Sequence, residues 1–218
     1  MLTLAVPKGR ILKELEPILR ACDIIPEDDF YDENCRKLEF QTSHDNVNII
    51  RVRSFDVATF VAFGAAQLGI CGGDILREFQ YKDVFAPVDL GIGRCRLSLA
   101  ENKNIAEHDD PKSWSHIRIA TKYPNLSSQY FAAKGVQVET IKLNGAMELA
   151  PKLGMCRRIV DLVSTGKTLQ ENGLVEIETL MEVSAQLVTN RTAMKTNSAV
   201  LRNIIGKFKS ESIKNAQS

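Results

Sequence analysis

Short apolar runs alternate along this chain with longer segments whose apolar residues recur at helical spacing. This alternation restricts the fold more than any other feature, because strands separated by helices favour parallel pairing within an α/β layer structure. The expected strands are 2–6, 37–42, 47–52, 68–71, 117–121, 136–142 and 159–163, and the expected helices are 7–22, 55–63, 75–79, 126–134, 146–149 and 194–208. The sequence therefore predicts an α/β protein with mainly parallel sheets, followed by a polar, frayed segment at 210–218.

A glycine-rich segment at 88–94 predicts a boundary between two lobes. It follows Pro87 and contains Gly91 and Gly93, as a hinge or crossover strand could. Segments 176–180 and 185–190 could then return the chain to the first lobe. We expect one lobe from residues 1–89 and 181–218 and another from residues 90–180. Ligands of open α/β sheets bind beyond the carboxyl ends of the strands, so we expect the site there.

The segment 160–168, VDLVSTGKT, joins the end of an apolar run to a loop of small and hydroxyl-bearing residues. A glycine that can take a positive φ allows several backbone N–H groups to turn toward one anion. The candidate phosphate-binding residues are Ser164, Thr165, Gly166, Lys167 and Thr168. Taken alone, these residues fit an ordinary strand-to-helix turn equally well. A nucleotide-binding loop of the type G-x-x-x-x-G-K-[ST] is excluded, because Asp161 occupies the position of its first glycine.

Asp161 gives this loop a second chemical property. A carboxylate beside a phosphate site repels the ligand unless it binds another group, and ribose hydroxyls or a bound Mg²⁺ are the obvious candidates. The combination predicts a sugar phosphate as the ligand.

Composition excludes several classes of function. Lys and Arg number 28 against 27 Asp and Glu, so the net charge of +1 gives no reason to expect nucleic-acid binding. The five cysteines form no C-x-x-C pair, which favours reduced thiols in a cytoplasm over a disulfide framework or a zinc site. No apolar run is long enough to span a membrane, and the initial apolar run is too short for a signal peptide.

Further segments accompany the loop in a fixed order. They read PKGR at 7–10, RKL at 36–38, GAAQLGICGGD at 64–74, ATKYPNL at 120–126 and ELAP at 148–151. Together with 159–174 they closely resemble the ATP phosphoribosyltransferases that open histidine biosynthesis. The resemblance extends over roughly the first 175 residues. Gln67 and Gly73 depart from the family pattern, which usually has an acidic residue and often a lysine there.

The resemblance implies transfer of a phosphoribosyl group from 5-phosphoribosyl 1-diphosphate to N1 of ATP, with Mg²⁺ carried by the substrate and no metal site in the protein. It also implies the two-lobed fold of type II periplasmic binding proteins, with the active site in the interlobe cleft. The chain looks like the family's short form, so we expect a hetero-oligomer with a histidyl-tRNA-synthetase-like regulatory subunit. A small-molecule binding or effector-sensing domain of the same fold is the alternative.

Arg10 and Arg36 are the expected catalytic residues, because guanidinium groups bind phosphate oxygens in pairs and stay charged. Asp161 is expected to accept hydrogen bonds from the ribose hydroxyls. No general base is required, since N1 of adenine has no proton to lose. The remaining candidate substrate-binding residues are Lys8, Asp74, Tyr123 and Glu148. Asp74 could instead cap a helix at Ile75, and Tyr123 could be a packed ring and not a platform for adenine.

Overall fold

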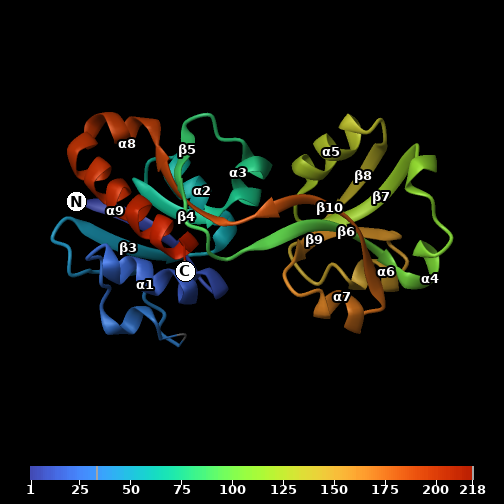
Figure 1. The fold of residues 1–218 in the computed structure, drawn as a ribbon, viewed down its shortest axis with the longest axis horizontal. Helices are drawn as coiled ribbons and strands as arrows, with labels where there is room; N and C mark the ends of the chain where they lie inside the picture. The colour runs from blue at the N-terminus through green and yellow to red at the C-terminus, as the bar shows by residue number, and fades with distance from the viewer. Residues whose placement is uncertain (33, 218) are drawn as a thin grey trace. The chain divides into compact units, whose positions relative to one another are not determined.

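The computed structural model describes residues 1–32 and 34–217, which form two compact units joined by two crossings of the chain (Figure 1). The first unit comprises Met1–Arg94 and the chain from Ser184 onward, and the second comprises Cys95–Val183. The crossings therefore lie a few residues after the predicted boundaries at 89/90 and 180/181.

The first unit is a six-stranded sheet in the order β2-β3-β1-β4-β11-β5. Its strands are β1 (Leu2–Pro7), β2 (Glu39–Phe40), β3 (Val47–Val52), β4 (Leu68–Gly72), β5 (Val84–Asp89) and β11 (Ala185–Asn190). The central strands β3, β1 and β4 are parallel, whereas β11 runs antiparallel to both of its neighbours. Its helical segments are α1 (Arg10–Ala21), η1 (Asp28–Phe30), α2 (Ser54–Ala62), α3 (Gly73–Phe79), α8 (Arg191–Thr196) and α9 (Ser198–Gln217).

Helices cover both faces of this sheet because alternate strand residues point to opposite sides. On one face, Leu4 of β1 packs in a core with Leu15 of α1 and Phe208 of α9, all fully buried. On the other face, Ala5 of β1 packs with Val57 of α2. A central parallel sheet buried on both sides is the arrangement that the strand–helix alternation predicts.

The second unit is a five-stranded sheet in the order β10-β6-β9-β7-β8. Its strands are β6 (Cys95–Asn102), β7 (His116–Thr121), β8 (Gln137–Lys142), β9 (Arg158–Val163) and β10 (Leu174–Val183). Strands β9, β7 and β8 are parallel, and β6 runs antiparallel to β9 and to β10. The helical segments are α4 (Lys103–Ala106), η2 (Pro111–Ser113), α5 (Pro124–Ala133), α6 (Leu149–Lys152) and α7 (Lys167–Glu171).

The two crossings lie side by side. Cys95, at the start of β6, pairs with Val183, at the end of β10. In the first unit, the Ser184 hydroxyl donates to the Asp89 carboxylate, with 2.8 Å to each oxygen. Antiparallel pairs made by β6 and β10 in the second unit, and by β2 and β11 in the first, make both sheets mixed, which corrects the expectation of mainly parallel sheets.

Two further expectations are corrected. Helix α1 begins at Arg10, not at Pro7, because Pro7 still pairs with Val52 in β1 and Gly9 has a φ of 98° that a helix cannot contain. Helix α9 runs to Gln217, so the segment after residue 210 is helical and not frayed through its length.

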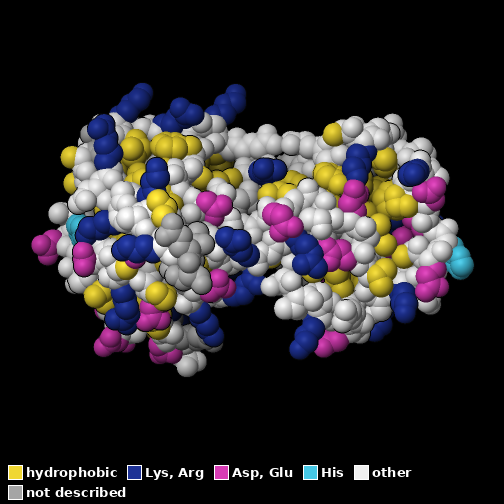
Figure 2. Space-filling model, viewed as in Figure 1, with side chains coloured by type: hydrophobic (Ala, Val, Ile, Leu, Met, Phe, Trp, Pro, Cys, Tyr) yellow, Lys and Arg dark blue, Asp and Glu magenta, His cyan; other side chains and the backbone are white. Residues whose placement is uncertain are grey.

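Charged side chains of both signs are interspersed on each unit over the face drawn in Figure 2, as the net charge of +1 leads one to expect. Within the described residues, no helix is both long enough and apolar enough to cross a membrane.

Candidate active site

Parallel strands place several candidate residues at one edge of the second unit. Strands β7 and β9 are neighbours with the register Thr121↔Val160, so the segments that follow them leave the sheet at the same edge. Strand β7 is followed by Lys122 and Tyr123, and β9 by the loop 164–166. The sheet therefore brings the predicted phosphate-binding loop and the end of β7 together.

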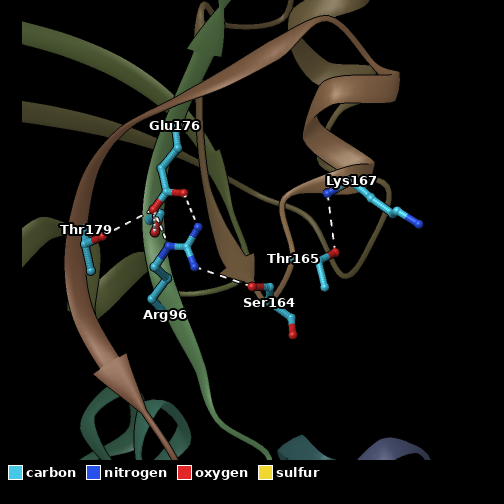
Figure 3. A network of polar contacts seen from close by, with 7 residues as sticks. Arg96, Ser164, Thr165, Lys167, Glu176 and Thr179 are labelled. Carbon is cyan, nitrogen blue, oxygen red and sulfur yellow. Dashed lines mark hydrogen bonds and ion pairs between the residues drawn. The ribbon is translucent and has the colours of Figure 1, made fainter.

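The loop turns at Gly166, which has a φ of 79° and is the N-cap of α7. Figure 3 shows the Thr165 hydroxyl below the amide of Lys167, which donates to it over 3.4 Å. The Gly166 carbonyl accepts from the amide of Gln170 at 3.1 Å, closing the first turn of the helix. Helix α7 begins at Lys167 and ends at Glu171. The hydroxyl-bearing side chains of the loop are exposed, as an anion-binding loop requires.

Asp161 lies two residues before the end of β9 and is half-buried. One of its oxygens accepts from the amide of Leu162 at 2.8 Å. Burial raises the pKa of the Asp161 carboxyl, the Leu162 amide lowers it, the Glu148 carboxylate raises it and Lys122 lowers it. Glu148 and Lys122 are therefore electrostatic neighbours of Asp161. Lys122 was not among the predicted site residues, although its position at the end of a buried strand could have identified it.

An ion pair that the sequence did not predict holds the base of the loop. Arg96 grips both carboxylate oxygens of Glu176, with Nε–Oε1 at 2.6 Å and Nη2–Oε2 at 2.5 Å. Its remaining nitrogen, Nη1, donates to the Ser164 carbonyl at 3.4 Å (Figure 3). Ser98 and Thr179 hydroxyls also donate to Glu176, at 2.7 and 3.2 Å. The Arg96 guanidinium holds the pKa of Glu176 at about 2, so the pair stays charged at neutral pH.

The first unit has a cationic edge of its own. Strands β1 and β3 are parallel neighbours that end at Pro7 and Val52, and the Lys8 amide donates to the Val52 carbonyl at 3.1 Å. Lys8 and Arg53, which follow these strands, are exposed. Arg53 was also not predicted, and its position after β3 was the available signal.

Arg10 is the first residue of α1 and has structural contacts. Its Nη2 donates to the Gly93 carbonyl at 3.1 Å, and its Nε lies 4.0 Å from Glu14. Glu14 in turn accepts from the Gly93 amide at 2.7 Å. About half of the Arg10 side chain is exposed, so it can still reach a ligand. Arg36 is exposed in the loop between η1 and β2.

Two of the remaining candidates are buried. Asp74 is 2% exposed and lies in the first turn of α3, whose N-cap is Gly72, so the expectation that Asp74 is the cap of a helix at Ile75 is wrong. Tyr123 is also 2% exposed, which favours the packed ring over a platform for adenine. Its amide donates to the Thr121 hydroxyl at 3.0 Å.

Two carboxylates lie at the strand that leads into the loop. Within the described residues, no group of three or more His, Cys, Asp or Glu side chains lies together in a way that could hold a metal ion. Asp161 and Glu148 supply two carboxylates. This donor set fits Mg²⁺ that arrives on a substrate, because Mg²⁺ is commonly bound through one or two carboxylates, substrate phosphates and water.

Comparison with known proteins gives consistent results along the chain. The family model described as ATP phosphoribosyltransferase matches residues 53–210. The chain is 59% identical over 208 residues to the ATP phosphoribosyltransferase of Rhodospirillum rubrum, covering 95% of this chain and 92% of that protein. It is 61% identical over 195 residues to the enzyme of Paramagnetospirillum magneticum, covering 89% of each.

Two solved structures share the fold. The ATP phosphoribosyl transferase (HisG:HisZ) complex from Thermotoga maritima superposes with a TM-score of 0.81 and 29% identity, over 98% of this chain and 100% of that chain. The GluR0 ligand-binding core in complex with L-glutamate superposes with a TM-score of 0.61 over 99% of this chain and 93% of that chain. At 10% identity the second likeness concerns the fold alone.

Proposed function

Since this chain belongs to the ATP phosphoribosyltransferase family, we propose that loop 164–168 and Asp161 bind its phosphoribosyl donor. The chain is a pentosyl-transferring enzyme of the first step of histidine biosynthesis, with the two-lobed fold of periplasmic binding proteins. It joins the phosphoribosyl group of 5-phosphoribosyl 1-diphosphate to N1 of ATP and releases diphosphate. The alternative of a binding or effector-sensing domain is not favoured.

The observation that carries this assignment is the geometry of the end of β9. The positive φ of Gly166 turns the loop so that α7 starts directly behind it, leaving the first amides of the helix without helical partners. Amides arranged in this way bind phosphate oxygens. We assign the 5-phosphate to these amides and to the loop's exposed hydroxyl groups.

Asp161 accepts hydrogen bonds from the ribose hydroxyls, with Glu148 beside it to orient them. The support is that the two carboxylates are electrostatic neighbours at the strand that leads into the loop. Removing Asp161 should cost the affinity of a charged hydrogen bond, roughly 1.5 to 3 kcal/mol. Calorimetric titration of Asp161→Ala and Thr165→Ala with 5-phosphoribosyl 1-diphosphate tests the assignment, and near-normal affinity in both variants would refute it.

Arg10 and Arg36 stabilise the polyphosphates, with Lys8 and the neighbouring Arg53 adding positive charge at the same sheet edge. N1 of adenine is a neutral nucleophile without a proton to lose, so rate depends on positioning it and on stabilising the departing diphosphate. If Arg36→Ala kept its turnover number and lost only affinity for ATP, its role on the leaving diphosphate would be wrong.

Mg²⁺ enters with the diphosphate and neutralises part of the charge that develops there. The chain's own contribution is to hold the donor at two points, the 5-phosphate in the loop and the ribose at Asp161. Asp74 and Tyr123 are buried and support the surrounding backbone, so a substrate would contact only the small part of each residue that remains exposed.

A regulatory partner completes the enzyme. The related Thermotoga maritima protein was solved as a HisG:HisZ complex, and we assign to this chain a hetero-oligomer with a histidyl-tRNA-synthetase-like subunit. We place it in the cytoplasm, where its free cysteines remain reduced. Incubation with ATP, 5-phosphoribosyl 1-diphosphate and Mg²⁺, with and without that subunit, should give phosphoribosyl-ATP at full rate only with the partner. Absence of product under both conditions would refute the activity.

A further inference from the structure

Arg51 is a buried cation without a carboxylate partner among the described residues. It lies on β3 in the first unit and is 4% exposed. Its guanidinium lies over the ring of Phe40, with 5.0 Å from Cζ to the ring centroid, and Nε has no hydrogen-bond partner in the described part of the chain. Burying a charge in this way costs stability, and an apolar residue of similar volume would avoid the cost. The benefit of an arginine here must therefore come from what its nitrogens hold.

Those nitrogens hold the backbone of one loop. The loop connects η1 to β2, and its described residues form no strand or helix. Nη1 donates to the carbonyls of Phe30 and Asp32 at 2.6 and 2.9 Å. Nη2 donates to the carbonyls of Cys35 and Lys37 at 2.5 and 3.4 Å. The Arg51 amide adds a bond to the Leu38 carbonyl at 2.8 Å.

The two Nη2 bonds fall on either side of Arg36. The carbonyls that they hold belong to the residues directly before and after it, so the guanidinium of Arg51 holds the peptide unit 35–36 on one side of Arg36 and the peptide unit 37–38 on the other. The side chain of Arg36 itself is exposed. The ion pair of Lys37 with Glu27 at 2.7 Å is exposed and weak by comparison, and Tyr31 and Cys35 pack against the core of the first unit.

We infer that Arg51 is a positioning residue of the reaction, which fixes the backbone on both sides of Arg36 and so directs that guanidinium toward the departing diphosphate. The inference rests on the role proposed above for Arg36. Only a planar fork of donors can hold four carbonyls at once, and a lysine has one nitrogen to offer. Small misplacement of a charged group is enough to lower turnover strongly, by as much as about 100-fold for 1 Å.

A double-mutant cycle tests the inference, with kcat and KM measured in the full chain and its partner subunit. Arg51→Lys should lower kcat by roughly 10- to 100-fold with a much smaller change in KM. In an Arg36→Ala background, the same substitution should lower kcat by less than about twofold further, because its effect passes through the missing side chain.

Arg158→Lys is the matched control. Arg158 is 5% exposed, but it lies in the second unit and pairs with Glu101 and Asp109. Arg158→Lys measures the general effect of removing a buried guanidinium. It should change kcat by the same factor in the wild-type and the Arg36→Ala backgrounds. A structural measurement accompanies the kinetics: trypsin should cut after Arg36 at least about tenfold faster in Arg51→Lys, because the flanking carbonyls are released. Arg51→Gln, which keeps two donors, replaces Arg51→Lys if the lysine variant does not fold.

The outcomes separate the two claims. If Arg36→Ala turns over normally, the role of Arg36 is wrong and the positioning role of Arg51 falls with it. If Arg36→Ala is impaired while Arg51→Lys lowers kcat by the same factor in both backgrounds, the role of Arg36 stands and the inference about Arg51 is overturned. Unchanged kcat in Arg51→Lys overturns it as well.

Discussion

Gly166→Ala should weaken binding of the phosphoribosyl donor without disturbing the fold of the second unit. Gly166 has a φ of 79°, and a Cβ at this position would meet only a Val163 methyl group, at 4.0 Å. The substitution therefore introduces backbone strain and no clash. An alanine in the left-handed region costs roughly 1 to 2 kcal/mol.

Two of the hydrogen bonds of the loop are long. The Ser164 carbonyl and the Thr165 hydroxyl each take part in a bond of 3.4 Å, which is long for a hydrogen bond. In the free alanine variant the loop should therefore relax to an unstrained conformation. Ligand binding must then return the loop to the turn, and the free energy of doing so is subtracted from the binding free energy. The same 1 to 2 kcal/mol becomes a rise in the dissociation constant of roughly 5- to 30-fold.

Calorimetric titration with 5-phosphoribosyl 1-diphosphate and Mg²⁺ measures this change, and Gly135→Ala is the control. Gly135 follows α5 in the same unit and has a φ of 76°, and a Cβ added there would meet no atom within 4 Å. The Gly135→Ala variant should lose a similar 1 to 2 kcal/mol of the free energy of unfolding, which corresponds to a fall in Tm of roughly 2 to 8 °C. Its affinity for 5-phosphoribosyl 1-diphosphate should not change. Wild-type affinity in Gly166→Ala, or equal weakening in both variants, would refute the reasoning.

Three further predictions concern stability, each measured by urea denaturation. The pKa of Glu176 is held at about 2 by Arg96, so their pair stabilises the fold above about pH 4.5 and loses this as pH falls toward 2. Arg96→Gln should therefore lower the free energy of unfolding at pH 7 and lower it progressively less in acid, and an equal loss at both pH values would contradict the reasoning. Burial raises the pKa of Glu101 to about 6, so ionisation of its carboxyl destabilises the fold as pH rises from about 4.5 to 6. Glu101→Gln should remove roughly 1 to 2 kcal/mol of this pH dependence of the free energy of unfolding. An unchanged pH profile in Glu101→Gln would contradict the prediction. In Gly69→Ala the added Cβ would lie 2.7 and 2.8 Å from valine methyl groups of α2, so the free energy of unfolding should fall by roughly 1 to 3 kcal/mol, and a loss below about 0.5 kcal/mol would mean that α2 moves aside easily.

Several strands could be predicted from their own apolar residues. Strands β1, β4 and β9 are short buried runs, and their type follows from hydrophobicity alone. Strand β6 was not predicted because its buried positions include Ser98 and Glu101, both fully buried. Such residues look solvent-exposed in a sequence. Their burial depends on Glu176 and Arg158, partners that lie far along the chain.

The candidate site shows the same division. The loop at Gly166 could be predicted because its turn requires a residue type that is visible in the sequence. Arg51 gave no signal, since its partners are backbone carbonyls 14 to 21 residues away, which any residue type would supply. Lys122 and Arg53 were not predicted, but each directly follows a predicted strand, so their positions were available from the sequence. Local chemistry can be predicted from sequence, whereas a contact made by the backbone of a distant loop cannot.

Arg96 and Arg51, neither of which the sequence singled out, hold loops in different electrostatic ways. Arg96 is fully engaged by a carboxylate, so the pair with Glu176 brings no net charge to the phosphate-binding loop. The charge of a bound 5-phosphate must then be met by the amides of the loop and by Lys167, whose side chain is exposed. The guanidinium of Arg51 has no carboxylate partner among the described residues and is buried among backbone carbonyls. In both places the arginine supplies geometry, and the contacts to substrate that we propose fall to the exposed cations beside them. A substitution at Arg96 or Arg51 should therefore be interpreted through the loop that it releases.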